Sequence, residues 1–85
     1  MVNVREAIAR LVMRKLAGSR ASVVDILDAN MGRHSAMTLR TANNASIIIY
    51  DDTTFVQSEG NEIRTLSFTN SDPQLSEGII NAALR

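Results

Sequence analysis

The chain has 85 residues with nine Lys or Arg and nine Asp or Glu, so its formal net charge is zero. A chain of this length predicts one domain over residues 1–85, which would bury only about 60% of the surface that its unfolded form exposes. It contains no cysteine, which excludes disulfide bonds and thiolate zinc sites, so the fold must rest on packing that two subunits could share.

Charge is distributed unevenly along the chain. Residues 1–40 hold seven basic and three acidic side chains, whereas residues 41–85 hold two basic and six acidic ones. Such a split predicts either a surface that binds polyanions or an attraction between the two halves, within one chain or across a homodimer.

The sequence predicts a cytoplasmic protein without a membrane span. No apolar run approaches the roughly 18 to 20 residues that a span needs, and charged residues interrupt the N-terminal segment where a signal peptide would be apolar. Residues 1–24 also have the basic composition of a transit peptide, but their helix start and stop signals favour a place in the fold.

The first predicted helix spans residues 4–17. Asn3 and Glu6 form a capping-box pattern at its start, and Gly18 supplies a stop signal. Apolar residues recur between these signals at helical spacing, namely Val4, Ile8, Leu11, Val12 and Leu16. Met13 lies to one side of this stripe, which predicts either a second apolar face that a partner or a second subunit covers or a single exposed apolar residue.

A second helix is predicted over residues 23–31. Ser22 and Asp25 repeat the capping pattern, and Gly32 marks the end. Its apolar face consists of Val23, Val24, Ile26, Leu27 and Met31. The short connection between the two helices favours an antiparallel hairpin or a sharp corner.

Residues 33–43 are open to two interpretations. Ser35 could cap a third helix, whereas residues 37–41 alternate apolar and polar side chains as a strand does. The threonines of this segment and the turn signal of Asn43 and Asn44 favour the strand.

Further strands are predicted at residues 46–50, 53–58 and 62–68. The consecutive isoleucines at 47–49 indicate a central strand that is covered on both faces. Asp51 and Asp52 follow this strand directly, and they suit the turn that brings the chain back alongside it.

Gly60 and Asn61 suit a two-residue hairpin turn between the last two of these strands, because both residue types tolerate positive φ angles. A turn centred there predicts that Phe55 lies opposite Leu66, with Phe68 on the same face of the sheet. This register gives the hairpin one apolar face.

A last helix is predicted from Asp72 and Pro73, a cap followed by a proline in the first turn, to the C-terminus. Gly78 inside it predicts close packing against the sheet or another helix. The elements together predict an α+β fold with two N-terminal helices, a three- or four-stranded antiparallel β-meander and a C-terminal helix.

No set of residues predicts an enzyme or a cofactor. His34 is the only histidine, and a lone histidine defines neither a catalytic triad nor a metal site. Asp51 and Asp52 are the best acid pair for a hard cation such as Mg²⁺, but aspartate is also common in turns, and a turn is needed here. The four glycines are scattered, which argues against a glycine-rich phosphate loop. We therefore predict no catalytic residue, no metal site and no cofactor.

The function that remains is a non-enzymatic protein-interaction module that self-associates. Arg10, Met13 and Arg14 on the first helix form the predicted contact patch, because methionine is an adaptable residue at contact surfaces. A domain this small suits a bacterial or phage regulator, inhibitor or assembly factor.

The alternative is a small winged-helix-like DNA-binding regulator built from the basic N-terminal half. Its third helix would lie near residues 35–42, and Arg33, His34 and Arg40 would contact DNA together with the first helix. The acidic residues at both tips of the following hairpin would repel the phosphate backbone, which favours the protein-interaction module.

Overall fold

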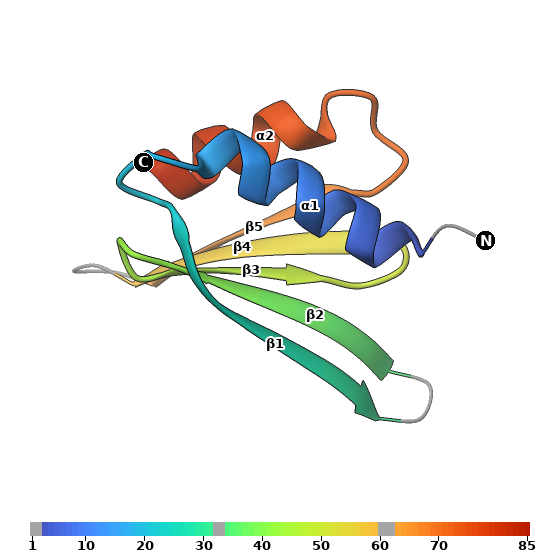
Figure 1. Ribbon diagram of the computed structural model, residues 1–85. Helices are drawn as coiled ribbons and strands as arrows, with labels where there is room; N and C mark the ends of the chain where they lie inside the picture. Colours follow the sequence, from blue (N-terminus) through green and yellow to red (C-terminus); the bar gives the residue numbers. More distant parts are fainter. Residues whose placement is uncertain (1–2, 32–33, 60–62) are drawn as a thin grey trace.

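The computed structural model describes residues 3–31, 34–59 and 63–85 (Figure 1). Within these ranges the elements are α1 (Val4–Leu16), β1 (Val23–Met31), β2 (His34–Thr41), β3 (Ala45–Ile49), β4 (Thr53–Glu59), β5 (Ile63–Thr69) and α2 (Leu75–Leu84). Each strand pairs antiparallel with its neighbour in the chain, so the sheet order is β1-β2-β3-β4-β5. The predicted α+β class and antiparallel meander are confirmed.

Both helices lie side by side on one face of the sheet (Figure 1). We call the opposite face the open face, because no helix covers it in the described part of the chain. The α1 helix begins as predicted, since the Asn3 side-chain oxygen accepts hydrogen bonds from the backbone N–H groups of Arg5 and Glu6 at 3.1 and 3.4 Å. It is followed by Gly18 with φ of 78°, a conformation that suits glycine.

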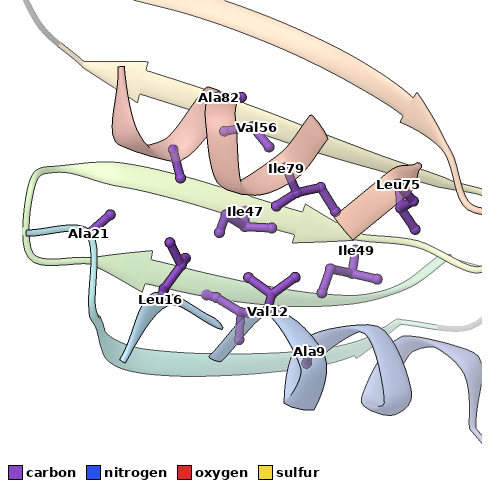
Figure 2. Close-up of a cluster of buried hydrophobic side chains, with 12 residues drawn as sticks. Ala9, Val12, Leu16, Ala21, Ile47, Ile49, Val56, Leu75, Ile79 and Ala82 are labelled. Atoms are coloured by element: carbon purple, nitrogen blue, oxygen red, sulfur yellow. The ribbon is translucent and has the colours of Figure 1, made fainter. Parts of the chain in front are cut away.

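The hydrophobic core fills the space between the helices and the sheet (Figure 2). Its largest fully buried apolar side chains are Val12, Leu16, Leu39, Ile47, Ile49, Val56 and Ile79. Along β3 burial alternates, with Ile47 and Ile49 fully buried and Ile48 half-buried on the open face. β3 is the central strand, but the prediction that it is covered on both faces is wrong, because both helices pack on the same side.

The prediction of a second helix over residues 23–31 is wrong, because this segment forms β1. Val23, Val24 and Ile26 are β-branched and favour extended backbone. The Asp25 carboxylate accepts the N–H of Ile26 at 2.9 Å rather than capping a helix. Together with β2, which confirms the predicted strand at 33–43, β1 brings the described sheet to five strands instead of three or four.

Two tight connections confirm the predicted turns. Asn44 adopts φ of 64° between β2 and β3, a left-handed conformation that asparagine tolerates. Asp51 and Asp52 connect β3 to β4, where the N–H of Tyr50 donates to the carbonyl of Thr53 at 2.9 Å. The acid pair is therefore part of a hairpin turn.

The predicted register of the β4–β5 hairpin is wrong by one residue. Val56, rather than Phe55, lies opposite Leu66. Leu66 and Phe68 consequently face the helices together with the buried Val56, whereas Phe55 points to the open face. The proposed turn at Gly60 and Asn61 lies outside the described residues.

The α2 helix begins at Leu75, slightly later than predicted, because Asp72 and Pro73 form a turn before it. The Asp72 carboxylate accepts the backbone N–H of Gln74 at 2.9 Å. Gly78 faces the ring of Phe68 on β5, and a Cβ atom at this position would lie 2.7 Å from its Cε1. The predicted close packing at Gly78 is confirmed.

Candidate functional site

The predicted contact patch on α1 does not form a separate apolar face. Met13 is half-buried and packs against the hydrophobic core. Arg10 and Arg14 are exposed, and the Nη2 atom of Arg10 lies 2.7 Å from Oε1 of Glu6, one turn away on the same helix. Met13 is therefore covered at least in part by the chain's own core. Val4 and Leu11 on the same helix are 51% and 37% exposed, and the contact role of Arg10, Met13 and Arg14 stays a prediction.

The winged-helix geometry of the alternative prediction is also wrong. The segment expected to form the third helix is β2, so the described chain has no recognition helix to place in a major groove. Arg40 is exposed and lies opposite Asp25 on the neighbouring strand. Arg33 and the side chain of His34 lie outside the described residues.

The Asp51–Asp52 turn is held by contacts from distant parts of the chain. The Nε atom of Arg5 lies 3.3 Å from Oδ1 of Asp51, which joins the basic N-terminal half to the acidic C-terminal half within one chain. The carbonyl of Asp52 accepts the N–H of Asn70 at 2.9 Å. Among the described residues, no group of three His, Asp or Glu side chains could hold a metal ion.

An open depression of about 490 Å³ lies between α1 and the first turns of α2. Its charged lining residues are Lys15 and Glu77, and the rest of the described lining consists of amide, hydroxyl and aliphatic side chains. Lys15 lies on α1 and Glu77 on α2, so each helix contributes one of these two charged side chains.

The strongest candidate surface lies on β1, at the edge of the sheet. Its exposed apolar side chains are Val24, Ile26 and Leu27, which are 65%, 47% and 51% exposed, and we call them the β1 patch. Ile26 lies opposite Leu39 on the helix-covered face, whereas Leu27 lies opposite Thr38 on the open face. The edge is therefore apolar on both faces at two adjacent positions.

The β1 patch is exposed because the helices do not reach it. The main contacts of α1 with the sheet are with β2 and β3, and those of α2 are with β3, β4 and β5. Toward its far end, the β1–β2 hairpin also bends away from the helix layer (Figure 1). A large apolar surface left uncovered at a sheet edge is characteristic of an interaction site.

The β1 patch continues onto the open face. Leu27, Thr38, Ile48 and Phe55 lie opposite one another on successive strands. The rings of Phe55 and Tyr50 pack edge to face, with centroids 5.9 Å apart and an interplanar angle of 89°. This arrangement places two aromatic rings and two large aliphatic side chains on a face that in most antiparallel sheets is polar.

The other edge of the sheet differs in chemistry. On the open face, β5 carries Thr65, Ser67 and Thr69, which are exposed and polar. On its helix-covered face Leu66 is exposed, while Phe68 is half-buried against α2. Among the described side chains, therefore, the edge that is apolar on both faces is that of β1.

Comparisons with protein-family models, with curated proteins and with solved structures find no match to this chain. Neither helix in the described residues is long and apolar enough to cross a membrane. Sequence reasoning missed the β1 patch because it placed these side chains on a buried helix face. The signal that could have found it is the pair of β-branched valines followed by apolar residues at adjacent positions 26 and 27.

Proposed function

We propose that the protein is a non-enzymatic protein-interaction module, a small regulator, inhibitor or assembly factor, that binds its partner through the β1 patch and the adjoining open face. The observation that carries this proposal is the exposure of Val24, Ile26 and Leu27 on a terminal strand that the helices leave uncovered. We place the contact region here rather than on the α1 patch, because Met13 packs against the hydrophobic core.

The physical basis is the combination of unpaired backbone and apolar side chains. A terminal strand pairs through only one side, so alternate N–H and C=O groups remain available to an added strand. Burying aliphatic side chains beside those hydrogen bonds supplies hydrophobic free energy, and side-chain shape supplies selectivity. Binding of this kind requires no catalytic group and no cofactor.

The proposal is tested by capture of partners from a lysate of the source organism on immobilised protein. The wild type is compared with Leu27→Lys and with the matched control Leu66→Lys, which places the same charge at a 40% exposed leucine on the opposite edge. We expect proteins retained by the wild type and by Leu66→Lys to be lost from Leu27→Lys. A capture pattern that is the same for all three proteins would refute a binding role for β1.

A control measurement separates loss of binding from loss of folding. Both leucines are exposed, so both lysine variants should unfold within a few degrees of the wild type. If instead the protein retains DNA in a manner that weakens steeply with salt, the protein-interaction proposal gives way to nucleic-acid binding.

A further inference from the structure

We propose that the partner strand at β1 is the β1 strand of a second copy of this chain, paired antiparallel about a twofold axis at Leu27. This inference rests on the proposed function, because it uses the same surface. It goes beyond that function by naming the molecule that binds at β1 and the alignment of the two paired strands.

The outer edge of β1 is available for strand pairing. In the described residues, no element lies along this edge (Figure 1). The N–H of Ile26 donates to the carboxylate of Asp25 at 2.9 Å, so this donor points away from β2 and is held by an exposed side chain. Because backbone groups alternate along a strand, those of Asp28 also point outward and those of Leu27 point toward β2.

The apolar pattern of the edge selects a second copy. Ile26 and Leu27 are apolar on opposite faces at adjacent positions, so a matching strand must also be apolar on both faces at the point of contact. An amphipathic strand has only one such face, whereas β1 itself satisfies the requirement. The β5 edge does not match, since Thr65 and Ser67 are polar on the open face, and β1–β5 pairing would extend head to tail without closing.

Symmetry and charge then fix the register. A twofold axis perpendicular to the sheet relates each residue on one side of the centre to one on the other side. Position 27 is the middle of Val23–Met31, so this centre gives the longest pairing, although the register of β1 shifts between Val23 and Asp25. Leu27 then faces its own copy, and Asp28 faces Ile26 of the second copy. An axis at Asp25 or at Asp28 would place two carboxylates directly opposite each other, which is unfavourable.

The size of the contact predicts a weak dimer. Three half-exposed side chains and one strand edge bury less than the roughly 800 Å² per partner of a standard stable interface. We therefore expect a weak dimer whose population rises with protein concentration, with rapid exchange between monomer and dimer.

Cysteine cross-linking tests the register directly, because the chain has no cysteine of its own. At Leu27 the two copies form a non-hydrogen-bonded pair with Cα atoms about 4.5 Å apart, within the range that a disulfide bridges. We expect Leu27→Cys to form a disulfide-linked dimer on oxidation at about 100 µM protein.

Two control variants make the test specific. In the proposed register the Val24 positions of the two copies are about 20 Å apart, and Thr65 is on the opposite edge of the sheet. Val24→Cys and Thr65→Cys should therefore stay monomeric under the same oxidation. Cross-linking of Val24→Cys to the same extent as Leu27→Cys would overturn the register, and cross-linking of Thr65→Cys alone would overturn the choice of edge.

Sedimentation of the protein without introduced cysteines provides a second test of self-association. We expect the mean mass to rise with concentration for the wild type and for Leu66→Lys, and to stay at the monomer for Leu27→Lys. A wild-type protein that remains monomeric at millimolar concentration overturns the second copy as occupant. If Leu27-dependent capture of another protein persists in that case, the proposed function stands while this inference fails.

Discussion

Asn70, directly after β5, links three segments of the sheet at the Asp51–Asp52 turn. Its side-chain Nδ2 donates to the carbonyls of Tyr50 and Asp51 at 2.6 and 3.0 Å. Its Oδ1 accepts the hydroxyl of Thr54, which is fully buried, at 2.7 Å. We predict that Asn70→Ala destabilises the fold more than any exposed alanine substitution on the strands.

The magnitude follows from what each bonded group loses. Removing the amide leaves the buried hydroxyl of Thr54 without its acceptor, which costs about 1–3 kcal/mol. The carbonyls of Tyr50 and Asp51 are beside an exposed turn and regain water, so each lost bond costs only about 0.5 kcal/mol. The sum is about 2–4 kcal/mol, which corresponds to a fall in melting temperature of about 10–30 °C for a domain of this size.

Urea and thermal denaturation followed by circular dichroism measure this change. Thr54→Val removes the hydroxyl at nearly constant volume and serves as the second arm of a double-mutant cycle. In the Thr54→Val background, Asn70→Ala should cost about 1 kcal/mol, because only the two carbonyl bonds remain to be lost. A cost below about 0.5 kcal/mol in the wild-type background would refute the role assigned to the Asn70 amide.

Three further substitutions test local features of the fold by the same denaturation assays. Asn44→Val should lower the free energy of unfolding by about 1–2 kcal/mol because of its positive φ, and Asn44→Gly should change it by less than about 0.5 kcal/mol. Gly78→Ala should destabilise the wild type, because the added methyl group would contact Phe68. In a Phe68→Ala variant the same change should raise the free energy of unfolding by about 1 kcal/mol. A rise of equal size in both proteins would contradict the close contact. Asn3→Ala should cost about 1 kcal/mol by removing the cap of α1, and no loss would show that the cap is dispensable.

The features that sequence predicted correctly are held by bonds between residues close in the chain. The start of α1 at Asn3 and the turn at Asn44 each depend on hydrogen bonds or dihedral preferences that span only a few positions. The turn at Asp51–Asp52 belongs to the same group, although Asn70 reinforces it from far along the chain. Such signals can be recognised in the sequence without knowledge of the tertiary packing.

The features that sequence predicted wrongly depend on distant partners. The β4–β5 register was one residue off because burial of Val56 against α2 and its pairing with Leu66, rather than a turn signal, align the two strands. Met13 was assigned to a second apolar face covered by a partner, because its angular position on the helix does not reveal that it packs against the chain's own core.

The amino-acid sequence by itself determined the α+β class, the positions of α1, α2 and the turns, and the absence of cysteine chemistry. Only the tertiary structure decided that residues 23–31 form a strand, because their backbone hydrogen bonds are made with β2, and the apolar pattern alone fits a helix equally well. It also decided that the β1 patch is exposed, since that depends on helices at the two ends of the chain covering the other strands and stopping short of β1. The candidate functional surface is therefore a product of packing, because the valines and apolar residues of positions 23–27 can indicate a strand but not whether the helices cover it.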